Sequence, residues 1–313
     1  MKFQAIFNDR GVNLLEKRFL PALEKVGKTC HLYLDRKHVI FLHNVLHGDG
    51  VQAITQFGKD TIFAEYRISS QNAGRIAFTI DLGLFLRALR SSVSMDGDVC
   101  QVKLVKKRAR SSGVTEKALP FLTFESKGHK SAVVQDVPIS QPLTRGAVQE
   151  LQDVLESGQG LPQTLVLLPA LGQLQGHVDQ LKNVGDVLDL AVTKCGDFYL
   201  RVNTPFVSIG TEYRGLKVLG DKVTPQSSVN EPVNPSGRLR EAINRGEAHS
   251  VKVAVKHFAK SLQCHLTKPD HSFIGVSPNE SCVLLMFQYF HSGSWEVDEN
   301  LHMHYRIPVL DSG

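Results

Sequence analysis

Two segments from the first half of the chain recur in the second half, in the same order. Segment 23–34 is matched 158 residues later by segment 181–192, since both carry Leu, Val and Gly at corresponding positions before an alternating apolar stretch. Segment 81–89 (DLGLFLRAL) is matched 173 residues later by segment 254–262 (AVKHFAKSL). Such repetition indicates one supersecondary unit used twice. The 313 residues therefore predict two similar domains rather than one large core.

The repeated unit predicts a strand, a helix and two further strands. In residues 1–7, Phe3, Ala5 and Phe7 lie on one side of an extended segment and residues 2, 4 and 6 on the other, as in a half-buried strand. Helical spacing follows until Gly27, a typical helix stop. Many short strands with helices at 12–26, 82–91, 170–183 and 256–262 predict an α+β fold with the helices on one side of the sheets.

The domain limits follow from composition. Residues 1–137 predict an N-terminal domain, the Pro- and Gly-containing segment 138–162 a connector, and residues 163–313 a C-terminal domain. An insertion at 221–249, rich in Pro and polar residues, would explain why the two repeat offsets differ. Pro21 lies inside the first predicted helix, where it removes a backbone hydrogen bond and is expected to kink or restart the helix.

The cysteines and the hydropathy pattern favour the cytosol or nucleus. The chain has five cysteines, an odd and widely dispersed set, which predicts reduced core residues rather than disulfides. No N-terminal apolar run of a signal peptide is present, and no stretch approaches the roughly 18 apolar residues of a membrane span. We therefore expect no membrane partner.

Enzyme motifs are weak. Gly27-Lys28-Thr29 resembles the end of a phosphate-binding loop, but it lacks the earlier glycine and follows a predicted helix instead of a strand. His302 and His304 alternate on one strand, yet no Cys or acidic residue stands at ligand spacing. We expect no catalytic residue, metal or cofactor; a nucleotide- or metal-dependent enzyme that uses Lys28 or the strand histidines is the alternative.

Basic residues occur on the polar sides of the predicted helices. They are Lys17, Arg18, Lys25 and Lys28 on or just after the first helix, Arg87 and Arg90 on the second, Lys182 on the third, and Lys256 and Lys260 on the fourth. Cations on equivalent helices of a duplicated fold predict a basic surface that contacts phosphates without reading sequence. Without an aromatic stacking platform, duplex DNA is favoured over single strands.

A separate basic run, which we expect to form a loop, contains Lys106, Lys107, Arg108 and Arg110. Three interpretations stay open for it: a solvated loop, a nuclear-import signal or a DNA contact.

Four segments carry a resemblance to a known family: MKFQAIF at the start, GKTCHL at 27–32, VQDVPI at 134–139 and YRIPVL at 305–310. On these segments, and over essentially its whole length, the chain resembles eukaryotic DNA sliding clamps. It is most similar to the Hus-type subunit of the heterotrimeric nine-one-one DNA-damage checkpoint clamp. The motifs are packing motifs, so their order carries the resemblance.

The resemblance implies a nuclear ring subunit of two similar domains, with helices that line a hole for duplex DNA and sheets outside. It implies two other clamp subunits, a clamp loader, and repair and checkpoint proteins as partners, some docking in a pocket beneath the connector. Edge strands would pair with the other subunits through Val133, Val134 and Val137 at one end and Phe206, Ile209 and Tyr213 at the other. A homotrimeric replication-type clamp is the alternative within the family.

Overall fold

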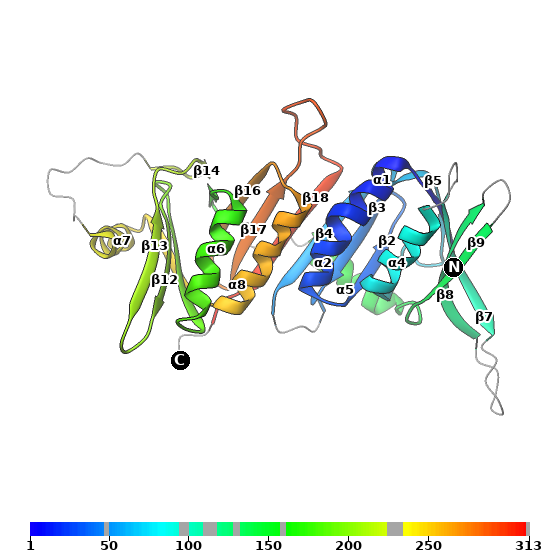
Figure 1. The fold of residues 1–313 in the computed structure, drawn as a ribbon, viewed down its shortest axis with the longest axis horizontal. Helices are drawn as coiled ribbons and strands as arrows, with labels where there is room; N and C mark the ends of the chain where they lie inside the picture. The colour runs from blue at the N-terminus through cyan, green and yellow to red at the C-terminus, as the bar shows by residue number, and fades with distance from the viewer. Residues whose placement is uncertain are drawn as a thin grey trace.

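The computed structural model describes residues 1–46, 50–93, 100–108, 118–127, 132–156, 161–223 and 234–310. Its strands form three antiparallel sheets, and helices cover them (Figure 1). The predicted α+β class is confirmed. Figure 1 shows an elongated molecule with the small sheets at its two ends and the largest sheet in the middle.

The central sheet has nine strands and takes strands from both halves of the chain. In spatial order they are β14 (Val218–Gly220), β10 (Thr164–Leu167), β16 (His271–Val276), β17 (Cys282–Gln288), β18 (Leu301–Pro308), β4 (Gln52–Gly58), β3 (His38–His43), β2 (Thr29–Leu34) and β6 (Ile76–Asp81). The two halves join where β18 pairs with β4, from Leu301 opposite Phe57 to Arg306 opposite Gln52. Backbone hydrogen bonds therefore connect segments that lie about 250 residues apart in the chain.

Each end of the molecule carries one smaller sheet. Sheet A, of five strands, has the order β5 (Phe63–Ser69), β1 (Lys2–Phe7), β7 (Gln101–Arg108), β8 (Ala118–Lys127) and β9 (Ala132–Pro138). Sheet C, of four strands, has the order β13 (Ser208–Tyr213), β12 (Phe198–Asn203), β11 (Val187–Thr193) and β15 (Ala248–Ala254). Strands β9 and β13 are thus edge strands.

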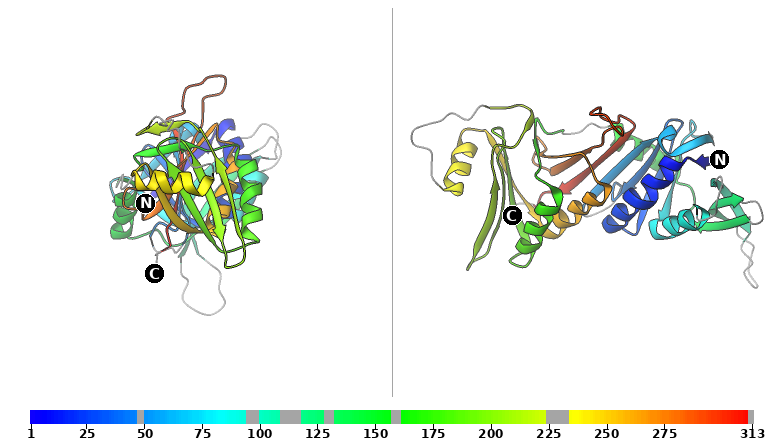
Figure 2. Two further views of the ribbon diagram at one scale, coloured as in Figure 1. Left: turned by 90° about the vertical axis from the view of Figure 1, so that its left-hand side faces the viewer. Right: turned by 45° about the horizontal axis from the view of Figure 1, so that its top comes forward.

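One face of the sheets is covered by the predicted helices (Figures 1 and 2). They are α1 (Asp9–Leu14) with η1 (Leu15–Phe19) and α2 (Leu20–Val26), then α4 (Leu82–Val93), α6 (Leu171–Lys182), and α8 (Val255–Ser261) with the 3-10 turn η2 (Leu262–Thr267). The described parts also contain the short α3 (Lys59–Ile62), which the sequence did not predict.

The first helix accommodates Pro21 through a π-helical segment. In η1, the Leu20 N–H donates to the Leu15 carbonyl, five residues back, and Pro21 then occupies the first turn of α2. Proline is tolerated in a first turn because the N–H it lacks has no intrahelical acceptor there. The expected interruption is therefore confirmed, and the helix continues past it to Gly27.

A single apolar core fills the space between the sheets and these helices. Its largest fully buried side chains include Phe19, Phe41, Phe57, Phe258 and Tyr305, which come from both halves of the chain. Asp81 caps α4, since its Oδ1 accepts from the Leu84 N–H at 2.8 Å. The core thus holds the helices of the two halves on one continuous support.

The connector forms a helix on the opposite face of the central sheet. Helix α5 (Arg145–Glu156) buries Val148 and Leu151 against a separate apolar cluster that includes Tyr33, Ile40 and Leu42. The side chains of α5 fill the surface directly under this helix, whereas the start of the connector, residues 141–148, borders a pocket. The spacing of three and four residues between Val148, Leu151, Val154 and Leu155 is typical of a helix.

The insertion contributes a second helix on that face. Helix α7 (Pro235–Asn244) lies over sheet C near Ala191, Tyr199 and Gly210, at positions that correspond by strand register to those under α5. An ion pair between Arg238 and Glu212, at 2.5 Å, holds it there. None of its residues is buried, so α7 packs more loosely than α5. Residues 224–233 of the insertion lie outside the described residues.

His43 is a buried titratable group beside the end of α2. Its Nε2 lies 3.2 Å from the Gly27 carbonyl oxygen, and the side chain is 1% exposed. Burial lowers the pKa of His43 from 6.5 to about 4; the Gly27 hydrogen bond opposes this shift, and the nearby Lys260 charge adds to it. The imidazole is therefore neutral in the folded protein at neutral pH.

We expect His43 to make the protein less stable in mild acid. The unfolded chain takes up the His43 proton near pH 6.5 and the folded chain only near pH 4, so the free energy of unfolding falls as pH drops through this window. The loss reaches about 3 kcal/mol at the acid end, since one pKa unit corresponds to about 1.4 kcal/mol. Urea unfolding at a series of pH values measures it.

The matched variant is His43→Gln, whose amide nitrogen can still donate to the Gly27 carbonyl but does not titrate. It should show a shallower fall in stability between pH 6.5 and 4 than the wild type. Equal slopes in the two proteins would contradict the assignment.

Candidate nucleic-acid and subunit interfaces

The predicted basic residues lie on or next to the helices of one face. Lys17 is on η1, Lys25 on α2, Arg87 and Arg90 on α4, Lys182 on α6, and Lys256 and Lys260 on α8; Lys28 immediately precedes β2. All of these side chains are exposed. The amphipathic pattern explains the placement, because each helix turns its apolar stripe to the sheets and leaves the charged positions in water.

Most of these cations are free of carboxylates in the part of the chain that the structure describes. Arg90 has a partner, since its Nε lies 3.5 Å from Glu16 Oε1. The described residues provide no ion pair for Lys17, Lys25, Lys28, Arg87, Lys182, Lys256 or Lys260. Unpaired cations on one face produce a positive potential that attracts polyanions.

The two lysines of α8 also act on a neighbouring histidine. Burial is the main cause that lowers the pKa of His257, and the charges of Lys256 and Lys260 lower it further. His257 is therefore held neutral between two lysines. Only the smaller part of this shift comes from the positive charges of Lys256 and Lys260.

Arg18 differs from the other predicted cations because it joins the two halves of the chain. Its guanidinium donates to the carbonyl oxygens of Thr267, at 2.8 Å, and Lys268, at 2.9 Å. It also lies over the Tyr289 ring, 5.8 Å from the centroid. These contacts occupy its guanidinium, so Arg18 is a structural residue more than a free surface charge.

The residues predicted for subunit contacts lie on the two edge strands or next to them. On β9, Val134 is 57% exposed; near the start of β13, Phe206 is 95% and Ile209 44% exposed. Val133 is half-buried, and Tyr213 stacks on Phe198. Exposed apolar side chains at a strand edge favour association with another chain.

Val137 differs from the other residues of this set because its side chain is buried. Its side chain is 3% exposed and belongs to the main core, because it points to the helix side of sheet A. The Val137 side chain is therefore not available to a partner, and a subunit contact at this position uses the Val137 backbone at the strand edge.

The basic run is also different from expectation. Lys106, Lys107 and Arg108 belong to β7 and pair with β8, so this part is a strand and not a loop. Lys107 Nζ donates to Asp136 on β9 at 2.7 and 2.6 Å. The alternation of Val102, Leu104 and Lys106 could have indicated a strand extended to this point. Arg110 lies outside the described residues.

The residues of the enzyme alternative are dispersed. His302 and His304 alternate with buried residues of β18, and His304 lies opposite Ile54 of β4. Among the described residues, no group of three or more His, Cys, Asp and Glu is placed to hold a metal ion. Gly27 ends α2 and Thr29 begins β2, so the chain runs there from helix to strand, opposite to a phosphate-binding loop.

In the described part of the chain, no helix is both long and apolar enough to cross a bilayer. The described cysteines are free, and Cys30, Cys100 and Cys264 are buried.

We expect Arg18 and Lys17 to respond differently to mutation. Arg18→Lys should lower the free energy of unfolding by about 1 to 3 kcal/mol, because lysine cannot make both forked hydrogen bonds to the Thr267 and Lys268 carbonyls. Lys17→Gln, at the exposed neighbour, should change it by less than about 0.5 kcal/mol. Urea unfolding measures both values, and equal effects would show that Arg18 does not hold the two halves together.

Comparisons with known proteins agree with this architecture. The Hus1 family, described as Hus1-like protein, matches residues 1–311. The checkpoint protein hus1 homolog of Dictyostelium discoideum is 27% identical over 273 residues, which cover 86% of this chain and 88% of that protein. Checkpoint protein HUS1 of Homo sapiens is 22% identical over 319 residues, covering 99% and 100%.

Solved structures with the same fold include two sliding clamps. Proliferating cellular nuclear antigen from Entamoeba histolytica aligns with a TM-score of 0.61 and 10% identity over 99% of each chain. PCNA from Thermococcus kodakaraensis aligns with a TM-score of 0.58 and 14% identity over 98% of this chain and 100% of that one. The predicted resemblance is confirmed: this chain has the sliding-clamp fold and belongs to the Hus1-like protein family.

Proposed function

We propose that the chain is a non-enzymatic subunit of a heterotrimeric, ring-shaped checkpoint clamp that encircles duplex DNA and carries repair and checkpoint proteins on its outer surface. The family membership and the sliding-clamp fold support this function. The observation that carries the ring is the pairing of β18 with β4 inside the chain.

That internal junction is a template for contacts between subunits. The central sheet consists of a five-strand part that ends at β18 and a four-strand part that begins at β4. Sheet A has five strands and ends at β9, and sheet C has four and begins at β13. If β9 of one subunit pairs with the counterpart of β13 in the next, another nine-stranded sheet forms, and repetition closes a ring.

Strand register extends the template to single residues. Pro138 ends β9 as Pro308 ends β18, which aligns Val134 with His304. Strand β13 pairs with β12 in the same way as β4 pairs with β3. This correspondence aligns Ile209 of β13 with Ala53 of β4. Ala53 is fully buried by β18, whereas Ile209 is 44% exposed. We infer that Val133, Val134, Phe206, Ile209 and Tyr213 lie at the subunit contacts, and that neighbouring subunits bury the exposed edges.

The cations of the helix face support weak contacts with duplex DNA. A closed ring retains DNA by its topology, so lysines and arginines that touch phosphates without reading bases suffice. By this proposal Lys17, Lys25, Lys28, Arg87, Arg90, Lys182, Lys256 and Lys260 face the DNA, with Arg18 supporting them. The division into domains 1–137 and 163–313 with a connector at 138–162 belongs to the same proposal.

Nuclear localisation and the use of a clamp loader follow from the same function. The strand position of Lys106, Lys107 and Arg108 disfavours these residues as an import signal, because such a signal is read in extended, accessible chain. The homotrimeric clamp and the enzyme that uses Lys28 or the strand histidines stay as alternatives. Each predicts a different result in the mixing experiment below.

Charge reversal tests the DNA-facing surface. The assembled ring with Arg87, Arg90, Lys256 and Lys260 changed to Glu should bind duplex DNA more weakly. Its plot of log affinity against log salt should be shallower by roughly 0.9 for each lost phosphate contact. Fluorescence anisotropy at several salt concentrations measures both. The control reverses Arg36, Lys217, Arg240 and Lys252, which belong to no helix of that face. Equal binding by the two variants would remove the proposed surface.

Mixing this chain with the two other clamp subunits tests the ring by light scattering. A one-to-one-to-one complex is expected, and Ile209→Asp should prevent it while the chain stays folded. Ile243→Asp is the matched control, because Ile243 is 43% exposed on α7 and Ile209 is 44% exposed on β13. A homotrimer of the chain alone would favour the replication-type clamp, and a monomer indifferent to both partners would favour the enzyme.

A further inference from the structure

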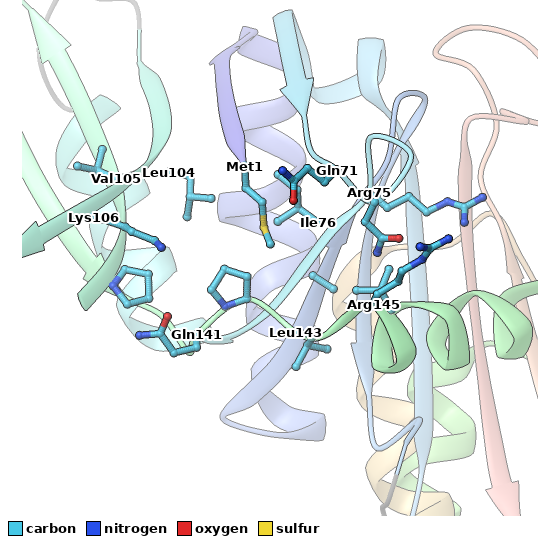
Figure 3. Close-up of a pocket in the computed structure, with 15 residues that line it drawn as sticks. Met1, Gln71, Arg75, Ile76, Leu104, Val105, Lys106, Gln141, Leu143 and Arg145 are labelled. Atoms are coloured by element: carbon cyan, nitrogen blue, oxygen red, sulfur yellow. The ribbon is translucent and has the colours of Figure 1, made fainter. Parts of the chain in front are cut away.

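A groove of about 800 Å³ lies between sheet A and the start of the connector (Figure 3). Its walls come from the turn before β6, from β7, and from residues 141–148, which lead into α5. The groove adjoins α5, because Arg145 and Val148 line it. Figures 1 and 2 show α5 on the sheet face away from the proposed DNA-facing helices. This volume is in the range of pockets that hold ligands or peptide side chains.

All charged side chains that line the groove are basic. Arg75, Lys106 and Arg145 line it, and none of its lining residues is acidic. In the described part of the chain, no carboxylate forms an ion pair with any of the three. Figure 3 shows Arg75 and Arg145 toward one end and Lys106 toward the other, with Met1 between them. Cations that converge on one hollow without an internal counter-ion favour an anionic ligand.

The floor of the groove is apolar. Ile76 and Ala77 are buried there, and Leu104, Val105 and Leu143 are half-buried. A free phosphate or a nucleic-acid backbone would leave the exposed parts of Leu104, Val105 and Leu143 in water, whereas a peptide side chain such as Leu or Phe would cover them. The amides of Gln71 and Gln141 are exposed at the rim, where they can hydrogen-bond an extended peptide backbone.

We propose that this groove binds an acidic peptide segment of a partner protein. The segment places an apolar side chain over the half-buried Leu104, and carboxylate or phosphate groups against Arg75, Lys106 and Arg145. This inference rests on the proposed function only for its context, a clamp whose outer face carries other proteins. The groove borders the surface that α5 fills, since Ala77, Leu143 and Val148 belong both to its lining and to the cluster under α5.

Selection from a random displayed-peptide library, with the full chain as bait, tests the proposal. We expect enriched peptides to carry Asp, Glu or both beside an apolar residue. Anisotropy titration of the enriched peptides should show at least about tenfold weaker binding to the double variant Arg75→Glu with Arg145→Glu, since attraction to a carboxylate becomes repulsion. Leu104→Ser should weaken binding as well, through the apolar contact.

The matched control is Lys217→Glu with Arg240→Glu, which changes the net charge by the same amount at exposed sites outside the groove. Its peptide affinity should stay within about twofold of the wild type, less than half a log unit. The proposal is overturned if no peptide is enriched, if enriched peptides have no excess of acidic residues, or if both double variants bind equally. Displacement of the peptides by duplex DNA would assign the groove to nucleic acid instead.

The proposed ring can be tested separately in the same variants. Arg75→Glu with Arg145→Glu should leave assembly with the other two subunits and retention of duplex DNA unchanged, because both residues lie away from β9, β13 and the helix face. Loss of peptide binding with an intact ring supports the groove. Failure of the wild type to form a ring, with peptide binding intact, would refute the clamp and keep the groove.

Discussion

The pairing of β18 with β4 is the constraint on which the rest of the molecule depends. It joins the first and last parts of the chain through a ladder of backbone hydrogen bonds and makes one nine-stranded sheet out of two halves. The helices of both halves consequently lie on one face and share one core. Arg18 strengthens the junction on that face, since it reaches from η1 to the carbonyls that follow α8. Without this junction the basic helices would have no common orientation.

The two faces of the sheets differ because different helices lie on them. On one face, helices bury apolar stripes and leave lysines and arginines in water, as suits contacts to phosphates. On the other face, α5 and α7 occupy corresponding places on the central sheet and on sheet C. Helix α5 is held by buried Val148 and Leu151, and α7 by the ion pair of Arg238 with Glu212. The groove beside α5 is a part of that outer face in which cations and half-buried apolar side chains meet. The fold thereby places the proposed DNA-facing helices and the proposed peptide groove on opposite faces.

Positive charge on a helix does not by itself identify a DNA contact. Arg18 satisfies the sequence pattern as its neighbour Lys17 does, yet its guanidinium bonds to backbone carbonyls. The same holds for apolar residues on an edge strand: Val134 is exposed, but Val137, three residues later on β9, is buried in the core. Periodicity assigns a residue to a face, whereas its partners come from elements far away in the chain.

Local sequence determined much of this protein. Alternation and helical spacing predicted most strands and the four principal helices, Asp81 was evident as a cap, and Pro21 marked the interruption of the first helix. These features depend on neighbours within a few residues, so the sequence carries them directly. Tertiary structure alone decided that β18 pairs with β4, that α5 fills the surface beneath it, and that Arg75, Lys106 and Arg145 share one groove. Each depends on contacts between segments tens to hundreds of residues apart, and pattern within a short window contains no information about such distances.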